Sequence, residues 1–187
     1  MKEEKEKIFE LVFKAKKGEE SAFEKLYYHY FVPIFRYIFF RVETKEEAED
    51  LTQKVFLKAW EGLRSFERKT NSFSSWLYKI AKNTIVDYYK ERKNFVLKAE
   101  TEILNKIKDK KSDPLEIAKK KEMIDFLKKA IEELTPDQKE VIVLKLINDL
   151  SNKEIAKIMG KTEEAIRALQ YRALLSLREK FKKLNLL

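Results

Sequence analysis

The chain contains no cysteine, and its 187 residues include only three glycines and three prolines. Without cysteine there is no disulfide framework, so nothing points outside the cytoplasm, where we expect the protein. The scarcity of glycine and proline argues against β-hairpins, whose tight turns need these residues, and favours an all-α fold. No run approaches the ~18 apolar residues of a membrane span, and the charged start MKEEKEKIFE is no signal peptide. We therefore expect no membrane insertion.

The residues that carry most enzyme chemistry are also scarce. His29 is the only histidine, and it lies in a run of tyrosines with no carboxylate or second histidine to form a site beside it. The sequence has no glycine-rich phosphate loop and no spaced cluster of metal ligands. We therefore expect a structural role for His29, no cofactor, no metal and no enzymatic activity.

Charge, by contrast, is abundant: 39% of the residues are charged and the net charge is +9. The basic excess is uneven, with nine lysines and arginines against four acidic residues over residues 151–187, and eight against five over residues 93–120. Such an excess is what phosphate binding needs, although solvated lysines also explain it.

Apolar residues spaced three and four apart predict a first helix over residues 3–17, ending at Gly18. A second helix begins near Phe23 and continues through YFVPIFRYIFFRV, where Pro33 should kink it or divide it. Thr44 and Glu47 form a capping box that opens a third helix.

The third helix has an outward face that is not simply polar. At 100° per residue, four side chains cluster opposite its buried stripe: Asp50, Gln53, Lys54 and Leu57. An apolar residue among polar groups is typical of a protein-binding face. A solvated face with one stray leucine is the alternative.

A polar and basic loop, which includes Arg68, Lys69 and Asn71, leads to a further helix, FSSWLYKIAKNTIVDYYKERK. Its apolar stripe should be buried, with Trp76 in the core. The far side is predicted to carry Tyr78, Lys79, Lys82, Tyr89 and Lys90. Tyrosines interleaved with lysines can stack unpaired bases while the lysines neutralise phosphates.

The periodicity weakens after Asn94, and Pro114 then fits the first turn of a new helix. We predict two small helical domains, residues 1–93 and 114–187, joined by a flexible linker over residues 94–113. A flexible segment of ~20 residues spans roughly 25 Å root-mean-square, enough, with two domain widths, to place two DNA readers a few helical turns apart.

The C-terminal segment predicts a helix-turn-helix over residues 151–181. Thr135 caps the helix QKEVIVLKLIND, which is β-branched but has helical neighbours, and Ser151 opens another capping box. Gly160 forms the turn, and Thr162 caps the long final helix.

The outward side of the final helix suits DNA. Its predicted members are Glu164, Arg167, Ala168, Tyr171 and Arg178, with Arg172 at the edge. An arginine near the N-terminus of a helix in the major groove can pair bidentately with a guanine edge. Arg178 lies further along and is expected to meet phosphates or solvent.

At two places the residues resemble bacterial sigma-70-type sigma factors. AEDLTQKVFLKAW with SFSSWLYKIAKNTIVDYYKERK is similar to their second region, and the stretch from LTPDQKEVIV to ALLSLRE is similar to their fourth. The resemblance covers roughly residues 19–92 and 121–183. Nothing resembling the third region lies between, and there is no long N-terminal extension. This compact form resembles the extracytoplasmic function (ECF) subgroup.

The resemblance implies roles and partners. The face with Asp50, Gln53 and Leu57 would bind the clamp helices of the largest subunit of core RNA polymerase. The loop over residues 66–73 would capture a flipped base of the minus-ten element in melted promoter DNA. Three residues of the adjoining helix would recognise that element: Asn83, Asp87 and Arg92. The final helix would read the minus-thirty-five element as a duplex, the apolar side of the fourth region would meet the flap of the second-largest subunit, and an anti-sigma factor would hold the protein inactive.

The sequence departs from the family at Glu164, where a small residue is common, and at Leu169, where a basic residue often stands. Base reading should therefore rest on Arg167, Tyr171 and Arg172. A stand-alone helix-turn-helix regulator, with an N-terminal dimerisation or sensor domain, remains the competing hypothesis.

Overall fold

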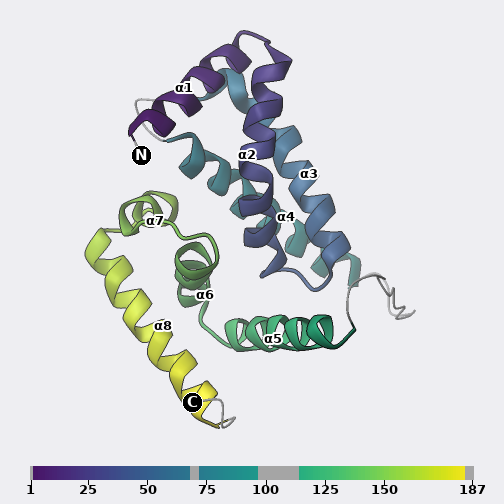
Figure 1. The fold of residues 1–187 in the computed structure, drawn as a ribbon, viewed down its shortest axis with the longest axis vertical. Helices are drawn as coiled ribbons and strands as arrows, with labels where there is room; N and C mark the ends of the chain where they lie inside the picture. The colour runs from purple at the N-terminus through teal and green to yellow at the C-terminus, as the bar shows by residue number, and fades with distance from the viewer. Residues whose placement is uncertain (1, 68–71, 97–113, 184–187) are drawn as a thin grey trace.

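The computed structural model of the chain describes residues 2–67, 72–96 and 114–183, and within these ranges every regular element is helical (Figure 1). The first domain contains α1 (Lys2–Lys16), α2 (Glu20–Phe39), α3 (Lys45–Gly62), the short turn η1 (Leu63–Ser65) and α4 (Phe73–Val96). The second contains α5 (Pro114–Glu132), α6 (Pro136–Ile142), the π-helical turn η2 (Val143–Ile147), α7 (Asn152–Met159) and α8 (Glu163–Lys183). The prediction of an all-α fold is confirmed.

The helices begin at the capping residues that the sequence predicts. The boxes at Thr44, Thr135 and Ser151 are all complete, with each hydroxyl accepting an N3 amide and each N3 side chain reaching back. Thr162 accepts a hydrogen bond from the Ala165 amide at 3.2 Å and so caps α8. These side chains satisfy amides that the first turn of a helix leaves unpaired.

Two predicted helices differ in detail. Pro33 lies inside α2 without dividing it, and buried side chains at Ile34 and Ile38 hold the second half of that helix against the core. The helix after Thr135 changes at Val143 into a π-helical turn, in which the Asn148 amide bonds the Val143 carbonyl at 3.1 Å. Residues 141–144, where the helix changes, are all buried, so this part of the chain has no single amphipathic stripe.

The N-terminal core forms where α2 packs against α1 and α3, and α3 packs against α4. Aromatic rings fill much of it, including the edge contact between Phe23 and Trp60 at 4.9 Å. Trp76 lies between Phe66 and Phe73, with ring centroids 5.1 and 5.6 Å away. The prediction that Trp76 belongs to the core is confirmed by this packing.

The C-terminal core forms where α8 packs across α6 and α7. Ile155, Ile166 and Ala173 are fully buried there. Gly160 ends α7 with φ of +64°, in the left-handed region that glycine adopts without steric cost.

The two domains lie against each other, as Figure 1 shows, with α7 packed on α4 and η2 packed on α2. None of the helices in the described ranges is long and apolar enough to cross a lipid bilayer.

Candidate polymerase and nucleic-acid interfaces

The outward face of α3 is presented to solvent as predicted. Asp50, Gln53 and Lys54 are exposed, and Leu57 is 59% exposed. Asp50 and Lys54 pair at 2.8 Å along the helix, an arrangement that weakly stabilises an exposed helix. An exposed leucine beside polar groups able to form hydrogen bonds is the chemistry of a protein interface.

A row of aromatic side chains on α2 was not predicted from the sequence. The row could have been found from its spacing of four residues, which places side chains on one face of a helix. Phe31 stacks on Phe35 at 6.2 Å, and Phe35 stacks on Phe39 at 5.7 Å. On the same helix Tyr28 is 69% exposed, so α2 also presents apolar surface to solvent.

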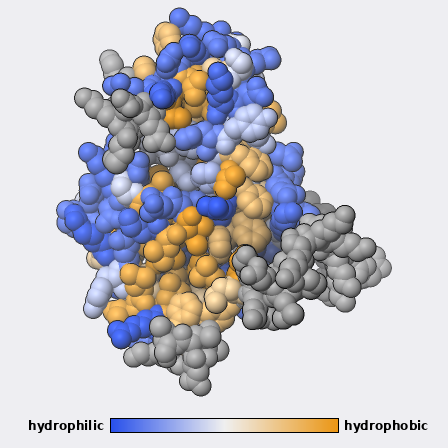
Figure 2. Space-filling model, in the orientation of Figure 1, coloured by the Kyte–Doolittle hydropathy of each residue, from blue (hydrophilic) through white to orange (hydrophobic). Residues whose placement is uncertain are grey.

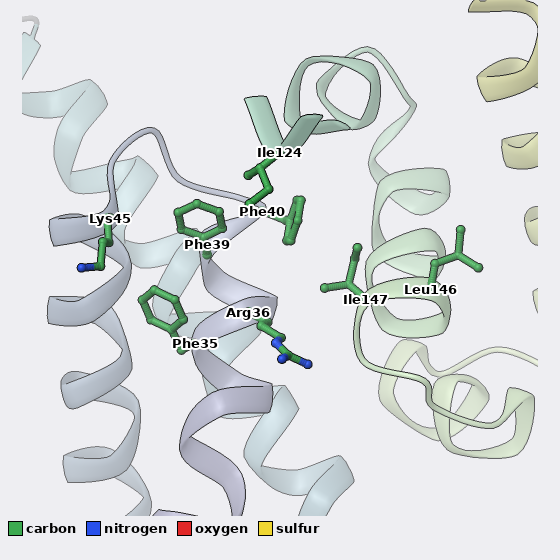
Figure 3. A pocket seen from close by; sticks show the side chains of 8 residues that line it. All are labelled: Phe35, Arg36, Phe39, Phe40, Lys45, Ile124, Leu146 and Ile147. Carbon is green, nitrogen blue, oxygen red and sulfur yellow. The ribbon is translucent and has the colours of Figure 1, made fainter. Parts of the chain in front are cut away.

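The row ends in an apolar cleft of about 480 Å³ between the domains. Its lining comes from both domains: Phe35, Arg36, Phe39, Phe40, Lys45, Ile124, Leu146 and Ile147. Figure 3 shows Ile147 of η2 pointing toward Arg36 and Phe40, with Ile124 of α5 above them. Figure 2 shows apolar residues gathered over the C-terminal helices, in the lower part of the view.

The predicted minus-ten surface lies on α4 and is largely exposed. Lys79, Asn83 and Lys90 are exposed, Lys82 is half-buried, and Tyr89 is 42% exposed. Lysines and an amide along one side of a helix can contact both phosphates and bases. Arg68, Lys69 and Asn71, predicted to join this surface from the preceding loop, lie outside the described residues.

Tyr78 does not belong to the exposed surface, and the prediction that it faces solvent is wrong. Its side chain is only 1% exposed, and its ring packs edge-on against Tyr37 at 5.2 Å. Burial raises the pKa of its phenol well above the ordinary value. On the helical wheel Tyr78 lies away from the apolar stripe of α4, but its ring packs on Tyr37 of α2 in the same domain. The second domain also contacts α4, through α7.

Two further residues that were predicted to contact DNA form ion pairs within the first domain. Asp87 pairs with Lys58 of α3 at 3.4 Å. Arg92 pairs with Glu43 at 2.8 Å and lies 3.4 Å from Glu47, and its hydrogen bond to Glu43 raises the pKa of the guanidinium. DNA phosphates would therefore compete with carboxylates for Arg92.

The predicted minus-thirty-five face of α8 is confirmed as an exposed surface. Arg167, Ala168, Arg172 and Arg178 are all exposed, and Tyr171 is 66% exposed. Ile166, Ala173 and Leu177 are buried on the opposite side, and Leu169 is half-buried.

Glu164 is also exposed, and it lies 3.5 Å from Arg167. A basic and aromatic helix face that is exposed to solvent is suited to a DNA groove. Among the described residues no cluster of histidine, aspartate and glutamate could hold a metal ion.

Comparison with known proteins matches both halves of the chain. Residues 26–95 match the family model described as Sigma-70 region 2, and residues 127–177 match that described as Sigma-70, region 4. The ECF RNA polymerase sigma factor BldN of Streptomyces coelicolor is 38% identical over 91% of this chain, which spans 64% of that relative's length. The ECF RNA polymerase sigma factor SigW of Bacillus subtilis is 30% identical over 90% of this chain and 94% of its own.

A solved structure agrees with this assignment. The sigma factor RpoE of Bartonella quintana, crystallised with the anti-sigma factor NepR, aligns with a TM-score of 0.65 and 26% identity, over 86% of this chain and 96% of that one. Both sigma regions therefore occur here in their expected order on a shared helical fold. The chain belongs to the ECF group of the sigma-70 family of RNA polymerase sigma factors.

Proposed function

We propose that this chain is a dissociable subunit of bacterial RNA polymerase that confers promoter specificity and starts transcription. The observation that supports this most is the coexistence, in one chain, of a region 2 and a region 4 that each present an exposed face of suitable chemistry. The subunit acts by binding, with no catalysis of its own, and works in the cytoplasm, where the polymerase and the promoter are.

The first domain, residues 1–93, docks on polymerase through α3. Leu57 supplies apolar area that becomes buried on docking, while Asp50, Gln53 and Lys54 fix the orientation through hydrogen bonds and charge. The partner surface is the pair of clamp helices in the largest subunit.

The same domain opens the minus-ten element. Separating two strands costs a few kcal/mol for each base taken from the stack. Stacking on aromatic rings and contacts to phosphates offset that cost. Lys79, Lys82 and Lys90 supply the positive charge on α4, and Asn83, Asp87 and Arg92 supply hydrogen-bonding groups. The loop before α4, with Arg68, Lys69 and Asn71, receives the flipped base.

The second domain, residues 114–187, reads the minus-thirty-five element as a duplex, and residues 94–113 connect the two domains. Arg167 near the start of α8 is positioned to contact a base edge, beside Tyr171 and Arg172. Thr162, Glu164 and Ala168 lie at the same end of the helix, and Arg178 is far enough along to meet a phosphate. The apolar side of the domain meets the polymerase flap.

An anti-sigma factor is the expected inhibitor. The related RpoE structure contains one, named NepR. The apolar cleft between the domains, lined by α2 on one side and by α5 and η2 on the other, is a surface that a single inhibitor could bridge. An occupant there would hold both domains together.

Run-off transcription with purified core polymerase tests the proposal. The chain should direct initiation at particular sites when a library of randomised promoters is offered, and core enzyme alone should not. Copurification separates the competing hypothesis of a stand-alone regulator, since a sigma factor must bind core polymerase in the absence of DNA, whereas the stand-alone hypothesis requires no such binding. Equal initiation with and without the chain would overturn the proposal.

A further inference from the structure

Three polar side chains from opposite domains are buried together at the domain seam. The Tyr37 hydroxyl of α2 donates a hydrogen bond to Glu140 Oε1 of α6 at 2.8 Å. Arg41, just beyond the end of α2, donates to Glu140 Oε2 at 2.9 Å and to the Tyr37 carbonyl at 2.7 Å. Its guanidinium also lies over the Tyr37 ring, 3.7 Å from the centroid. Both carboxylate oxygens of Glu140 are thus bound by side chains of the other domain.

The ion pair at the centre of this cluster is shielded from water. The side chain of Arg41 is 8% exposed and that of Glu140 is 10% exposed. Bringing two charges out of water costs most of what their attraction returns, so such a pair selects one geometry more than it adds affinity. When the domains separate, both charges regain their hydration. An interface built this way is specific and can still come apart.

Further contacts join the two domains around this cluster, and one of them involves α4, the helix proposed to bind the minus-ten element. Lys128 of α5 bonds the Val42 carbonyl at 3.2 Å and lies 3.7 Å from the centre of the Phe39 ring. Farther along the seam α7, the first helix of the helix-turn-helix, packs on α4. Tyr78 of α4 is buried against Tyr37 of α2, whereas the face of α3 with Leu57 and the outer face of α8 stay exposed.

Promoter geometry conflicts with this closed arrangement. The two elements are centred about 25 base pairs apart, which at ~3.4 Å per base pair is roughly 85 Å. A compact chain of this length has a radius of gyration of only about 16 Å. Helices that contact each other cannot engage both elements at once, so the seam must part before the proposed function is carried out.

We propose that the buried cluster of Tyr37, Arg41 and Glu140 is an intramolecular latch that keeps the free chain closed until polymerase binds. The latch rests on the proposed sigma function for its purpose, but the closed state itself can be tested on the free chain. Closure lowers the apparent affinity for polymerase because only the open fraction can bind fully. If the closed form holds about nine-tenths of the chains, releasing it raises that affinity about tenfold.

A distance measurement between spin labels tests the latch. Lys45 and Leu146 line one cleft across the seam, and the chain has no cysteine of its own. Lys45→Cys and Leu146→Cys therefore place two labels close together only in the closed form. The free parent chain should give one narrow, short distance, and adding core polymerase and promoter DNA should lengthen it.

Glu140→Gln is the decisive variant, because it leaves Arg41 buried without a counter-charge when the domains close. It should give a broad, longer distribution in the free chain and about tenfold tighter binding to core polymerase, with helicity by circular dichroism unchanged. Glu133→Gln, which removes a carboxylate paired with Lys180 inside one domain, is the matched control and should stay closed. Joint replacement Arg41→Met with Glu140→Leu removes both charges and should restore the short distance.

The outcomes separate the latch from the sigma function. A long, broad distribution in the free parent chain overturns the latch, as does a folded Glu140→Gln variant that stays closed. If Glu140→Gln fails to fold, the labelled parent chain still tests the latch. A distance between the labels that stays short in the complex with core polymerase and promoter DNA would overturn it. Failure of the parent chain to bind core polymerase overturns the proposed function, whatever the distances in the free chain.

Discussion

Arg92 Nη2 lies 2.8 Å from Glu43 Oε2, which ties the C-terminal half of α4 to the segment just before α3. Arg92 also lies 3.2 Å from the Tyr88 hydroxyl, and Tyr88 in turn donates to Glu47. A side chain proposed to bind the minus-ten element is therefore already bound to carboxylates in the free chain.

Glu43→Gln should release Arg92 for DNA. We expect binding of a single-stranded minus-ten oligonucleotide to tighten by up to about fivefold, because an exposed ion pair of ~0.2–1 kcal/mol no longer competes. Fluorescence anisotropy at fixed salt measures this. Glu24→Gln on α2 changes the net charge equally and should tighten binding less. Equal gains for both variants would mean that only net charge matters.

Asp50→Ala with Gln53→Ala should weaken binding to core polymerase about tenfold or more, since the few residues that dominate an interface each cost over about 1 kcal/mol when truncated. Both side chains are exposed, so folding should be unaffected. Competition for a labelled sigma factor on core polymerase is the measurement. Glu20→Ala, also exposed but on α2, serves as the control, and an equal loss there would remove α3 from the interface.

Arg167→Ala should abolish preference at one base pair of the minus-thirty-five element, a loss of about 1–3 kcal/mol confined to the cognate duplex. Arg178→Ala should instead lower affinity for all duplexes evenly and reduce the salt slope by about one. Titrations of cognate and scrambled duplexes at several salt concentrations distinguish the two patterns. A uniform loss for Arg167→Ala would contradict its assignment to a base edge.

Gly160→Ala should destabilise the C-terminal domain by about 1–2 kcal/mol, because alanine is strained in the left-handed region. The backbone there has φ of +64°, and an added Cβ would meet no atom within 4 Å, so strain acts without a clash. Gly160→Asn should cost less, as asparagine tolerates this region better. Urea unfolding measures both, and equal costs would show that strain is not the cause.

Stability should fall as pH rises above about 10. Burial, aided by the hydrogen bond to Glu47, raises the pKa of Tyr88 to about 12, and burial also raises the pKa of Tyr37 and Tyr78. The folded chain holds these protons more tightly than the unfolded chain, so their contribution is complete below the unfolded pKa and is lost as pH rises through the folded one.

Tyr88→Phe removes one such group. The difference in unfolding free energy between pH 9 and pH 11 should shrink by less than about 1 kcal/mol, since Tyr88 is only half-buried and solvent screens it. Urea unfolding at the two pH values gives the comparison, and Tyr171→Phe, on the exposed face of α8, is the control. An unchanged pH dependence in Tyr88→Phe would contradict the assignment.

The features that could be predicted from the sequence depend on residues close together in the chain. The capping boxes at Thr44, Thr135 and Ser151 depend on residues three apart, so the sequence alone located those helix starts. The exposed faces of α3 and α8 follow from helical periodicity, which requires only that each helix buries one stripe.

The features that could not be predicted depend on contacts between residues far apart in the sequence. Arg41 and Glu140 are separated by 99 positions, and no local pattern marks either as a partner. Tyr78 lies outside the apolar stripe of its own helix, yet it is buried against Tyr37 of α2, a contact that no pattern within α4 indicates. The π-helical turn that begins at Val143, among buried residues, was likewise not predicted from the sequence.

The helices, their caps and the outward residues could be deduced from the sequence, because they depend on neighbours within a few turns, and the two sigma motifs already indicated the family. Which outward residues stay exposed depends on tertiary packing. Packing on Tyr37 removes Tyr78 from the DNA-binding face. The closed seam joins Tyr37 to Glu140, because burying a charge requires a partner that folding alone brings within reach.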